Sequence, residues 1–313
     1  MISYVLRRLG TSLVLTVLVS MITFFLLSTS FDGIVHSILG TAATPAAVQA
    51  KKAEMGMDRP VIVQYFTWLF HALQGDFGVS YFTSQPVGTA VADHLTVTLS
   101  VVVVALAVTA VISVVLGVLA ASRGGVIDRL AQATSLFGYI MPNLLLAIGL
   151  VVVLAVKLDW LPATGYTPFA ENPARWAASI TIPVIALAIG GIANLSAQIR
   201  GAMIGELRKD YVRTLRTRGI SPRSIVLRHA LRNAAGPAFT VLSLEFIAML
   251  GGALIIENVF ALPGIGSYSF NAALQGDVPI IMGLSLFGVV FVVAVNLVVD
   301  IVNGWLNPKA RQQ

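Results

Sequence analysis

The chain has few side chains whose chemistry suits catalysis, and none of them stands in a catalytic spacing. It contains no cysteine, no His-Glu-x-x-His or Gly-x-Ser-x-Gly run, and no pair of aspartates inside an apolar stretch. The histidines are scattered outside the apolar runs, as His36, His71, His94 and His229. We therefore expect no catalytic residue, no metal ligand set and no bound cofactor.

One carboxylate interrupts an otherwise apolar run, Glu245 within residues 234–256. A charged side chain at the centre of a bilayer costs about 2.5–3.5 kcal/mol on insertion scales, so Glu245 must face protein or water. In one interpretation it lines a transport path and contacts a peptide amine. In the other it is bonded to a neighbouring helix or a partner subunit, as the protonated acid if need be. Both interpretations stay open.

Asn194 and Gln198 complete the candidate translocation path. They lie four residues apart in the apolar run 176–199, so they share one face of a helix. We weigh hydrogen bonding between helices above contact with a transported solute, because amides inside a membrane usually bond across helices.

A basic segment, residues 201–233, separates two of the apolar runs. Within it Leu207, Tyr211 and Leu215 recur every four residues, which predicts a helix with one apolar face. The arginines and the lysine of this stretch fall on the other faces. The pattern is also typical of an amphipathic helix lying on a membrane surface, which is the simpler alternative.

A second helix is expected to follow the first after a sharp corner. Gly219 is placed to end the first helix in a left-handed conformation. Ser221 then caps a new helix, and Pro222 fills its first position, where no N–H group is needed. We expect a helix, a rigid corner and a helix that rejoins a span at Pro237.

Composition shows which elements must position these residues. Hydrophobic residues make up 57% of the 313-residue chain and charged residues 11%, which is far from soluble composition. A spanning helix needs about 20 apolar residues. Six runs satisfy this: 9–31, 95–122, 130–156, 176–199, 234–256 and 278–299. We predict an all-α integral membrane protein with six transmembrane helices.

Lysine and arginine are divided unevenly between the two sides of these spans. Fifteen flank the side that holds both termini and the basic segment, and five flank the other side: Lys51, Lys52, Arg59, Lys157 and Arg175. The positive-inside rule therefore places both termini and residues 201–233 in the cytoplasm. Because the charge flanks spans rather than gathering with aromatics on one face, the net charge of +6 does not indicate nucleic acid.

The longest segment outside the spans follows the first of them. Thr44 before Pro45 predicts one helix start, and Pro60 predicts another. The apolar stripe of the second helix consists of Val61, Tyr65, Trp68 and Leu69. We expect it to lie on the membrane surface or pack on the spans, and we weigh a structural cap above a docking surface. The chain thus divides into a first span (1–31), an outer segment (32–94), a core (95–304) and a tail (305–313).

Small residues and prolines inside the spans predict how the helices meet. Thr109, Ser113 and Gly117 form a small-residue stripe of the kind that packs against another helix. Pro142 and Pro183 are candidates to kink their spans.

Two stretches of the basic segment, DYVRTLRTRG (210–219) and RHALRN (228–233), resemble the coupling loop of dipeptide and oligopeptide permeases of the ATP-binding cassette (ABC) class. Further matches follow in the same order over nearly the whole chain: YVLRRL (4–9), MDRP (57–60), QY (64–65), GDFGVS (75–80), PV (86–87) and PGIG (263–266). The general importer pattern has Glu-Ala-Ala six residues before the loop glycine, where this chain has Arg-Thr-Leu. Peptide permeases tolerate this difference, so it favours the peptide subfamily within the importer class.

The resemblance implies a type I ABC importer permease fold in a prokaryotic inner membrane, with an extracytoplasmic insertion after the first helix. It implies a second homologous permease subunit, two ATP-binding subunits, and an extracytoplasmic substrate-binding protein that delivers di- or oligopeptides. The absence of a Gly-x-x-x-x-Gly-Lys-Ser/Thr loop agrees that ATP hydrolysis must come from other chains. Carried over by position, the residues that couple to an ATPase subunit are Arg213, Leu215, Gly219, Ser221, Pro222 and Arg223.

Two alternatives remain for the transported solute and its driving force. Relatives within the same class move nickel, haem or other small solutes, since selectivity resides largely in the binding protein. A proton-coupled secondary transporter would use Glu245 as its titrating group, but no inverted repeats are evident.

Overall fold

The computed structural model describes residues 2–40 and 42–306, which are helical apart from connecting loops and an isolated bridge between Val79 and Pro86. The chain divides into two compact units. Among the described residues, the first comprises 2–40, 42–97 and 263–297, and the second comprises 98–262 and 298–306. Most of the tail expected at residues 305–313, from 307 onward, lies outside the described residues.

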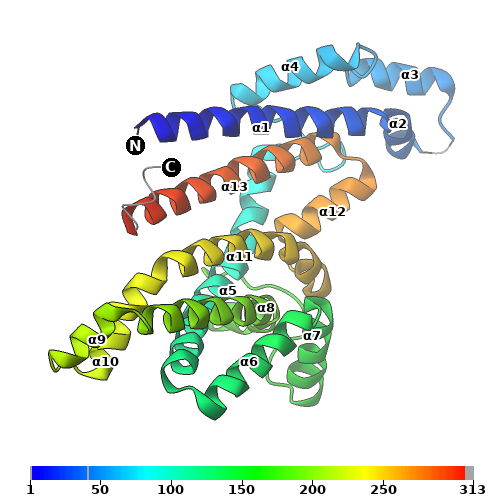
Figure 1. Ribbon diagram of the computed structural model, residues 1–313. Coiled ribbons are helices and arrows are strands. Elements are labelled where there is room, and N and C mark those ends of the chain that lie inside the picture. The colour runs from blue at the N-terminus through cyan, green and yellow to red at the C-terminus, as the bar shows by residue number, and fades with distance from the viewer. Residues whose placement is uncertain (1, 41, 307–313) are drawn as a thin grey trace. The chain divides into compact units, whose positions relative to one another are not determined.

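The first unit consists of helices from the N-terminal and C-terminal parts of the chain (Figure 1). They are α1 (Ile2–Ser28), α2 (Phe31–Leu39), α3 (Pro45–Glu54), α4 (Val61–Leu73), the beginning of α5 (Val87–Arg123), α12 (Ile265–Gln275) and most of α13 (Val278–Leu306). The second unit holds the rest of α5, then α6 (Gly125–Ile140), α7 (Asn143–Leu150), the π-helix η1 (Val151–Lys157), α8 (Pro173–Leu207), α9 (Asp210–Thr217), α10 (Pro222–Ser224), the π-helix η2 (Ile225–Ala230) and α11 (Leu231–Phe260).

The structure confirms the predicted helical membrane architecture but changes one span. Among the described residues, five helices are long and apolar enough to cross a membrane, and a sixth span results if one bent pair is counted as one. That pair, Gly125–Ile140 and Asn143–Lys157, is bent by 101°. The kink expected at Pro142 is therefore confirmed and divides the third span in two, because this proline stands at the break as the N-cap of α7.

The outer segment folds as its capping residues predict. Thr44 caps α3, since its Oγ1 accepts a hydrogen bond from the Ala47 N–H at 3.3 Å. Helix α4 lies beside α1 (Figure 1), and its apolar stripe packs on that span. Tyr65 is 1% exposed and its hydroxyl lies 2.9 Å from Ser20 Oγ. The prediction that this stripe packs on a span is confirmed.

The GDFGVS segment is held by a buried carboxylate that follows α12. Asp277 is 3% exposed, and it accepts hydrogen bonds from the Ser80 hydroxyl and, at 3.2 Å, from the Tyr81 N–H. Ser80 Oγ accepts in turn from the Thr83 N–H at 2.9 Å. A loop with no regular structure of its own is thus fixed to a helix almost two hundred residues later in the chain.

The small-residue stripe of α5 packs against α8, as predicted. The Thr109 and Ser113 hydroxyls donate to the backbone oxygens of Ala188 and Ile192, at 3.5 and 3.3 Å. At Gly117 a Cβ atom would lie 2.7 Å from Ile199 Cγ2 and 2.9 Å from the Ser196 backbone oxygen. The two helix backbones therefore approach so closely that this position requires glycine.

We expect Gly117→Ala to destabilise the protein by about 1–3 kcal/mol, because the added methyl group meets the backbone of α8. The measurement is the thermal unfolding midpoint of the purified membrane protein. Gly149→Ala is the matched control, since a Cβ there meets nothing within 4 Å. Equal midpoints for the two variants would show that the α5–α8 contact is looser than described.

Candidate functional site

The basic segment forms a helical elbow, which we define as residues 210–230. Its first helix, α9, ends as expected at a glycine in the left-handed region, with Gly219 at φ +75°. The Gly219 N–H donates to the Arg216 oxygen at 3.0 Å, and the Ile220 N–H donates to the Leu215 oxygen at 3.1 Å. These bonds satisfy carbonyl groups that the end of a helix leaves free.

The second half of the elbow begins at the predicted cap. Ser221 Oγ accepts from the Ser224 N–H at 3.4 Å, and Pro222 occupies the first helical position. The helix then continues through α10, η2 and α11 as one stretch, Pro222–Phe260, with Pro237 inside it. The expectation of a separate second helix that rejoins a span at Pro237 is therefore wrong, because this proline does not end the helix.

The continuous helix is longer than a membrane is thick. Its 39 residues extend about 58 Å at 1.5 Å per residue, against a hydrocarbon core of about 30 Å. Roughly half of it therefore projects beyond the hydrocarbon. The elbow's second helix and the membrane span thus belong to one helix, which contains the wider π-turns of residues 225–230 and Pro237.

A network of polar side chains fixes the entry to the elbow. The Tyr211 hydroxyl donates to Glu206 Oε2 at 3.0 Å and accepts from Asn233 Nδ2 at 3.3 Å, while Lys209 Nζ pairs with the other Glu206 oxygen. The hydrogen bond to Glu206 raises the pKa of Lys209. Burial is the main cause that raises the pKa of Tyr211, so its hydroxyl stays protonated. The network joins the end of α8, the start of α9 and α11.

The residues proposed for coupling lie mostly on the outside of the elbow. Leu215 is half-buried, and the exposed members are Arg213, Gly219, Ser221, Pro222 and Arg223. Val212 and Ile225, which the sequence interpretation did not single out, are 1% and 2% exposed and anchor the two helices. A buried residue in each helix leaves the basic face free for another protein.

The root of the elbow rests on an apolar cluster in the same unit. Its buried members are Val118, Leu195, Ile199, Met203, Ala230 and Ala234, from α5, α8 and the long helix. These close-packed side chains join the root of the elbow to α5 and α8.

The candidate path residues are only partly brought together. Asn194 Nδ2 donates to Glu245 Oε1 at 2.6 Å, so α8 and α11 meet at these two side chains. The other carboxylate oxygen lies beside Gly191, where a Cβ would come within 3.2 Å of it. Gln198 is exposed one turn further along α8 and takes no part in this contact.

A groove of about 510 Å³ runs along α6 and α8 beside the Asn194–Glu245 pair. Asn194 lines it together with Gln132, Ser135, Tyr139 and Arg200. Amide and hydroxyl groups along an otherwise apolar groove suit a polar, uncharged backbone such as that of a peptide.

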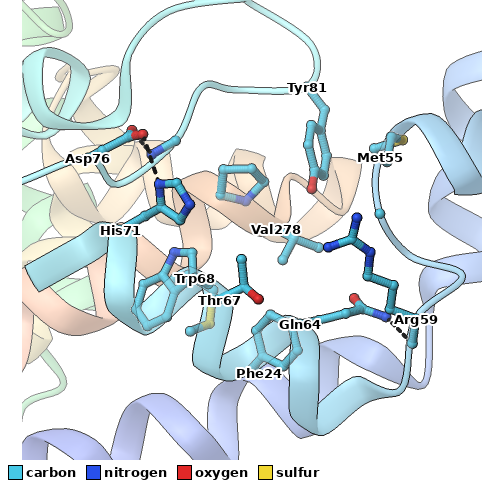
Figure 2. Close-up of a pocket in the computed structure, with 14 residues that line it drawn as sticks. Phe24, Met55, Arg59, Gln64, Thr67, Trp68, His71, Asp76, Tyr81 and Val278 are labelled. Atoms are coloured by element: carbon cyan, nitrogen blue, oxygen red, sulfur yellow. Dashed lines mark hydrogen bonds and ion pairs between the residues drawn. The ribbon is translucent and has the colours of Figure 1, made fainter. Parts of the chain in front are cut away.

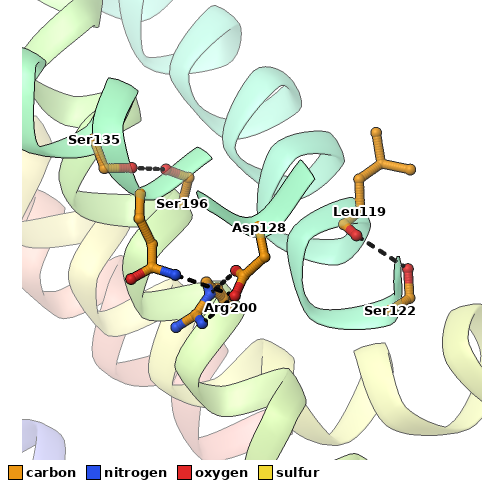
Figure 3. Close-up of polar contacts among 7 residues, drawn as sticks. Leu119, Ser122, Asp128, Ser135, Ser196 and Arg200 are labelled. Carbon is orange, nitrogen blue, oxygen red and sulfur yellow. Dashed lines mark hydrogen bonds and ion pairs between the residues drawn. The ribbon is translucent and has the colours of Figure 1, made fainter. Parts of the chain in front are cut away.

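Arg200, which lines this groove, forms an ion pair with Asp128 that the sequence interpretation missed (Figure 3). Arg200 donates two hydrogen bonds to the Asp128 carboxylate, from Nε to Oδ1 and from Nη2 to Oδ2, the second at 2.7 Å. Gln132 Nε2 donates to the same carboxylate at 3.1 Å, and Ser135 and Ser196 join α6 to α8 at 3.2 Å. The two charges are 72 positions apart, so no local pattern connects them.

A second carboxylate on the long helix was also missed. Glu257 is 1% exposed, and the Thr98 hydroxyl of α5 donates to it at 2.5 Å. Nearby, the Gly165 N–H donates to the Phe260 oxygen at 2.8 Å. In the sequence, Glu257 directly follows the apolar run 234–256, where a charged residue is expected at the end of a span. It anchors the far end of the long helix.

A helical bundle with an exposed basic elbow continuous with a span, and a largely apolar groove with a few polar groups beside that span, is typical of a membrane transport subunit. Comparison with known families agrees: residues 113–312 match the binding-protein-dependent transport system inner membrane component family, and residues 1–102 match its N-terminal region. The chain belongs to this family, and it is an integral membrane permease component of an ABC transporter.

Several relatives match over nearly the full length of both chains. A peptide transport system permease protein of Brucella abortus is 35% identical over 312 residues, covering 99% of each chain. The metal-staphylopine import system permease protein CntB of Staphylococcus aureus is 31% identical, covering 100% of this chain and 99% of its own. The dipeptide transport system permease protein DppB of Lactococcus lactis is 30% identical, covering 99% and 100%.

A solved structure shows the same fold. The MetNI methionine ABC transporter, in an inward-facing conformation, has a chain that matches with a TM-score of 0.56 and 17% identity. The match covers 69% of this chain and 96% of that one. The type I permease fold expected from the resemblance is confirmed.

Proposed function

We propose that this permease forms half of the path by which an ABC importer moves di- or oligopeptides into the cell. Its partners in this proposal are a second homologous permease subunit, two ATP-binding subunits and an extracytoplasmic binding protein. The relatives named for peptide and dipeptide transport support the substrate class. The basic excess on one side of the spans supports cytoplasmic termini and a cytoplasmic elbow.

The observation that carries the proposal is the continuity of the elbow with the span that bears Glu245. Closure of the ATP-binding subunits would displace the exposed corner at Arg213, Gly219 and Arg223. Because Pro222–Phe260 is one helix, the displacement would reach Glu245 and its partner Asn194 along a single element, through the π-turns of residues 225–230 and Pro237. Repeated closure and opening would expose the groove alternately to the two sides of the membrane.

The test is uptake of a labelled dipeptide by proteoliposomes that contain the whole complex with its binding protein. We expect uptake that needs ATP inside the vesicles and persists when an uncoupler removes the proton gradient. Uptake that stops with the uncoupler but not with ATP depletion would instead identify a proton-coupled transporter.

A metal chelate is the second candidate substrate, because CntB is named for the import of metal-staphylopine. Nickel and haem belong to the same alternative. The binding protein that copurifies with the permease separates the candidates: mass spectrometry of its bound ligand should show a peptide. A bound metal complex would keep the importer mechanism and change its cargo.

A further inference from the structure

A pocket of about 250 Å³ lies within the first unit (Figure 2). It is bounded by the end of α1, by α4 and the loop before it, and by the start of α13. Phe24, Val278 and Met282 give it one apolar side. Nothing in the transport mechanism above uses it.

The opposite side of this pocket presents hydrogen-bond donors. The Arg59 guanidinium, the Thr67 hydroxyl and the Tyr81 hydroxyl all point toward its middle (Figure 2). The Gln64 side-chain amide donates to the Arg59 backbone oxygen at 2.8 Å, which fixes the backbone that carries the guanidinium. Trp68 also lines the pocket, and its indole Nε1 is buried without an acceptor in the described part of the chain.

The one carboxylate in the lining is already engaged. Asp76 Oδ1 accepts from the Gly78 N–H at 3.0 Å, and Oδ2 lies 3.6 Å from His71 Nδ1. Arg59 takes part in none of the ion pairs among the described residues. Burial, with a smaller contribution from the Asp277 charge, raises the pKa of Tyr81 to about 12, so its hydroxyl remains a donor at neutral pH. The pocket therefore offers a cation and several donors to an anion.

The depth of the pocket in the membrane follows from its walls. Phe24 stands near the end of the span Gly10–Ser28, and Val278 begins the span Val278–Leu297. Helix α4 turns a second apolar face outward, with 44–77% of each side chain exposed: Ile62, Val63, Phe66, Phe70 and Leu73. That face is available to lipid because α4 runs alongside the span of α1, where Tyr65 bonds to Ser20. Since Phe24 and Val278 stand near the ends of two spans, the pocket lies at the edge of the hydrocarbon, where the lipid head groups begin.

We propose that this pocket binds the phosphate group of an anionic phospholipid. Arg59 is its ionic partner, the Thr67 and Tyr81 hydroxyls donate to its oxygens, and the glycerol end of the lipid lies against Phe24 and Met282. Arginine and phosphate form strong charge-assisted hydrogen bonds. The apolar side of the pocket and its depth favour a lipid over a free anion.

The test is native mass spectrometry of the purified complex, titrated with phosphatidylglycerol in mild detergent. We expect one tightly held phosphatidylglycerol per copy of this subunit, and binding about tenfold weaker in Arg59→Gln. Thr67→Val and Tyr81→Phe should each weaken it by a smaller factor. The control is Arg175→Gln, which removes an exposed arginine outside the pocket and should bind as the wild type does.

Three outcomes would overturn the proposal. Equal retention by Arg59→Gln and the wild type would remove Arg59 from the site. Release of the bound lipid by millimolar inorganic phosphate would indicate a site for soluble anions. Undiminished lipid retention in Arg59→Gln with loss of stimulation by the binding protein would assign the pocket to a protein partner. Lipid retention is measured without ATP or peptide, so its result is independent of the transported solute.

Discussion

Gly219→Val should abolish most ATP-driven uptake, whereas Gly219→Asn should retain much of it. The backbone at this corner is left-handed, at φ +75°, where a β-branched residue is strained and asparagine is tolerated. A Cβ here meets no atom within 4 Å, so neither side chain is excluded by this chain. The two variants therefore differ mainly in whether the corner keeps its shape.

The readouts are uptake by reconstituted complexes and the ATPase rate with and without the binding protein. We expect Gly219→Val to lose on the order of tenfold in uptake and to lose stimulation by the binding protein. Copurification of the ATP-binding subunits is the control for assembly. If valine and asparagine proved equally damaging, bulk at the contact with another subunit would explain the loss, and the shape of the corner would not.

Glu245→Gln should lower uptake about tenfold while the complex still assembles, if the charge contacts the substrate. Glutamine keeps the size of the side chain and an oxygen that can accept from Asn194 Nδ2, so the contact between α8 and α11 survives. Uptake per assembled complex, measured at several peptide concentrations, separates weaker binding from slower transport.

Glu257→Gln is the matched control on the same helix. Glu257 is enclosed and bonded to Thr98, so its replacement should lower the thermal unfolding midpoint more than it lowers uptake per assembled complex. If Glu245→Gln instead impaired folding or assembly and left uptake per assembled complex unchanged, Glu245 would be a structural residue and not part of the transport path.

The elbow could be predicted because its corner is set by local chemistry. A glycine that ends one helix and a serine and proline that start the next leave their signature within four residues, and the structure has both. The caps of the outer segment were readable for the same reason. The end of the second helix was not, because Pro237 was taken as a boundary and the helix continues through it.

Features that depend on distant partners could not be predicted. Hydropathy reports that residues 130–156 are apolar but not that the helix turns by 101° within them. The Asp128–Arg200 pair joins positions with no periodic relation, and Glu257 finds Thr98 from another helix. Asn194 and Glu245 could each be identified in the sequence as polar residues within apolar runs. Only the fold shows that their side chains form a hydrogen bond.

In the mechanism proposed above, the long helix from Pro222 to Phe260 would act as a lever. Its far end is held by the hydrogen bond between Glu257 and Thr98, and the elbow forms the opposite end. From Glu257 to Pro222 the helix extends about 52 Å at 1.5 Å per residue, so a swing of about 5° would carry the tip by about 5 Å, the height of one helical turn. Glu245, roughly 18 Å from the fixed end, would travel only about a third as far. A large displacement at the proposed ATP-binding subunits would therefore become a small displacement beside the transported solute.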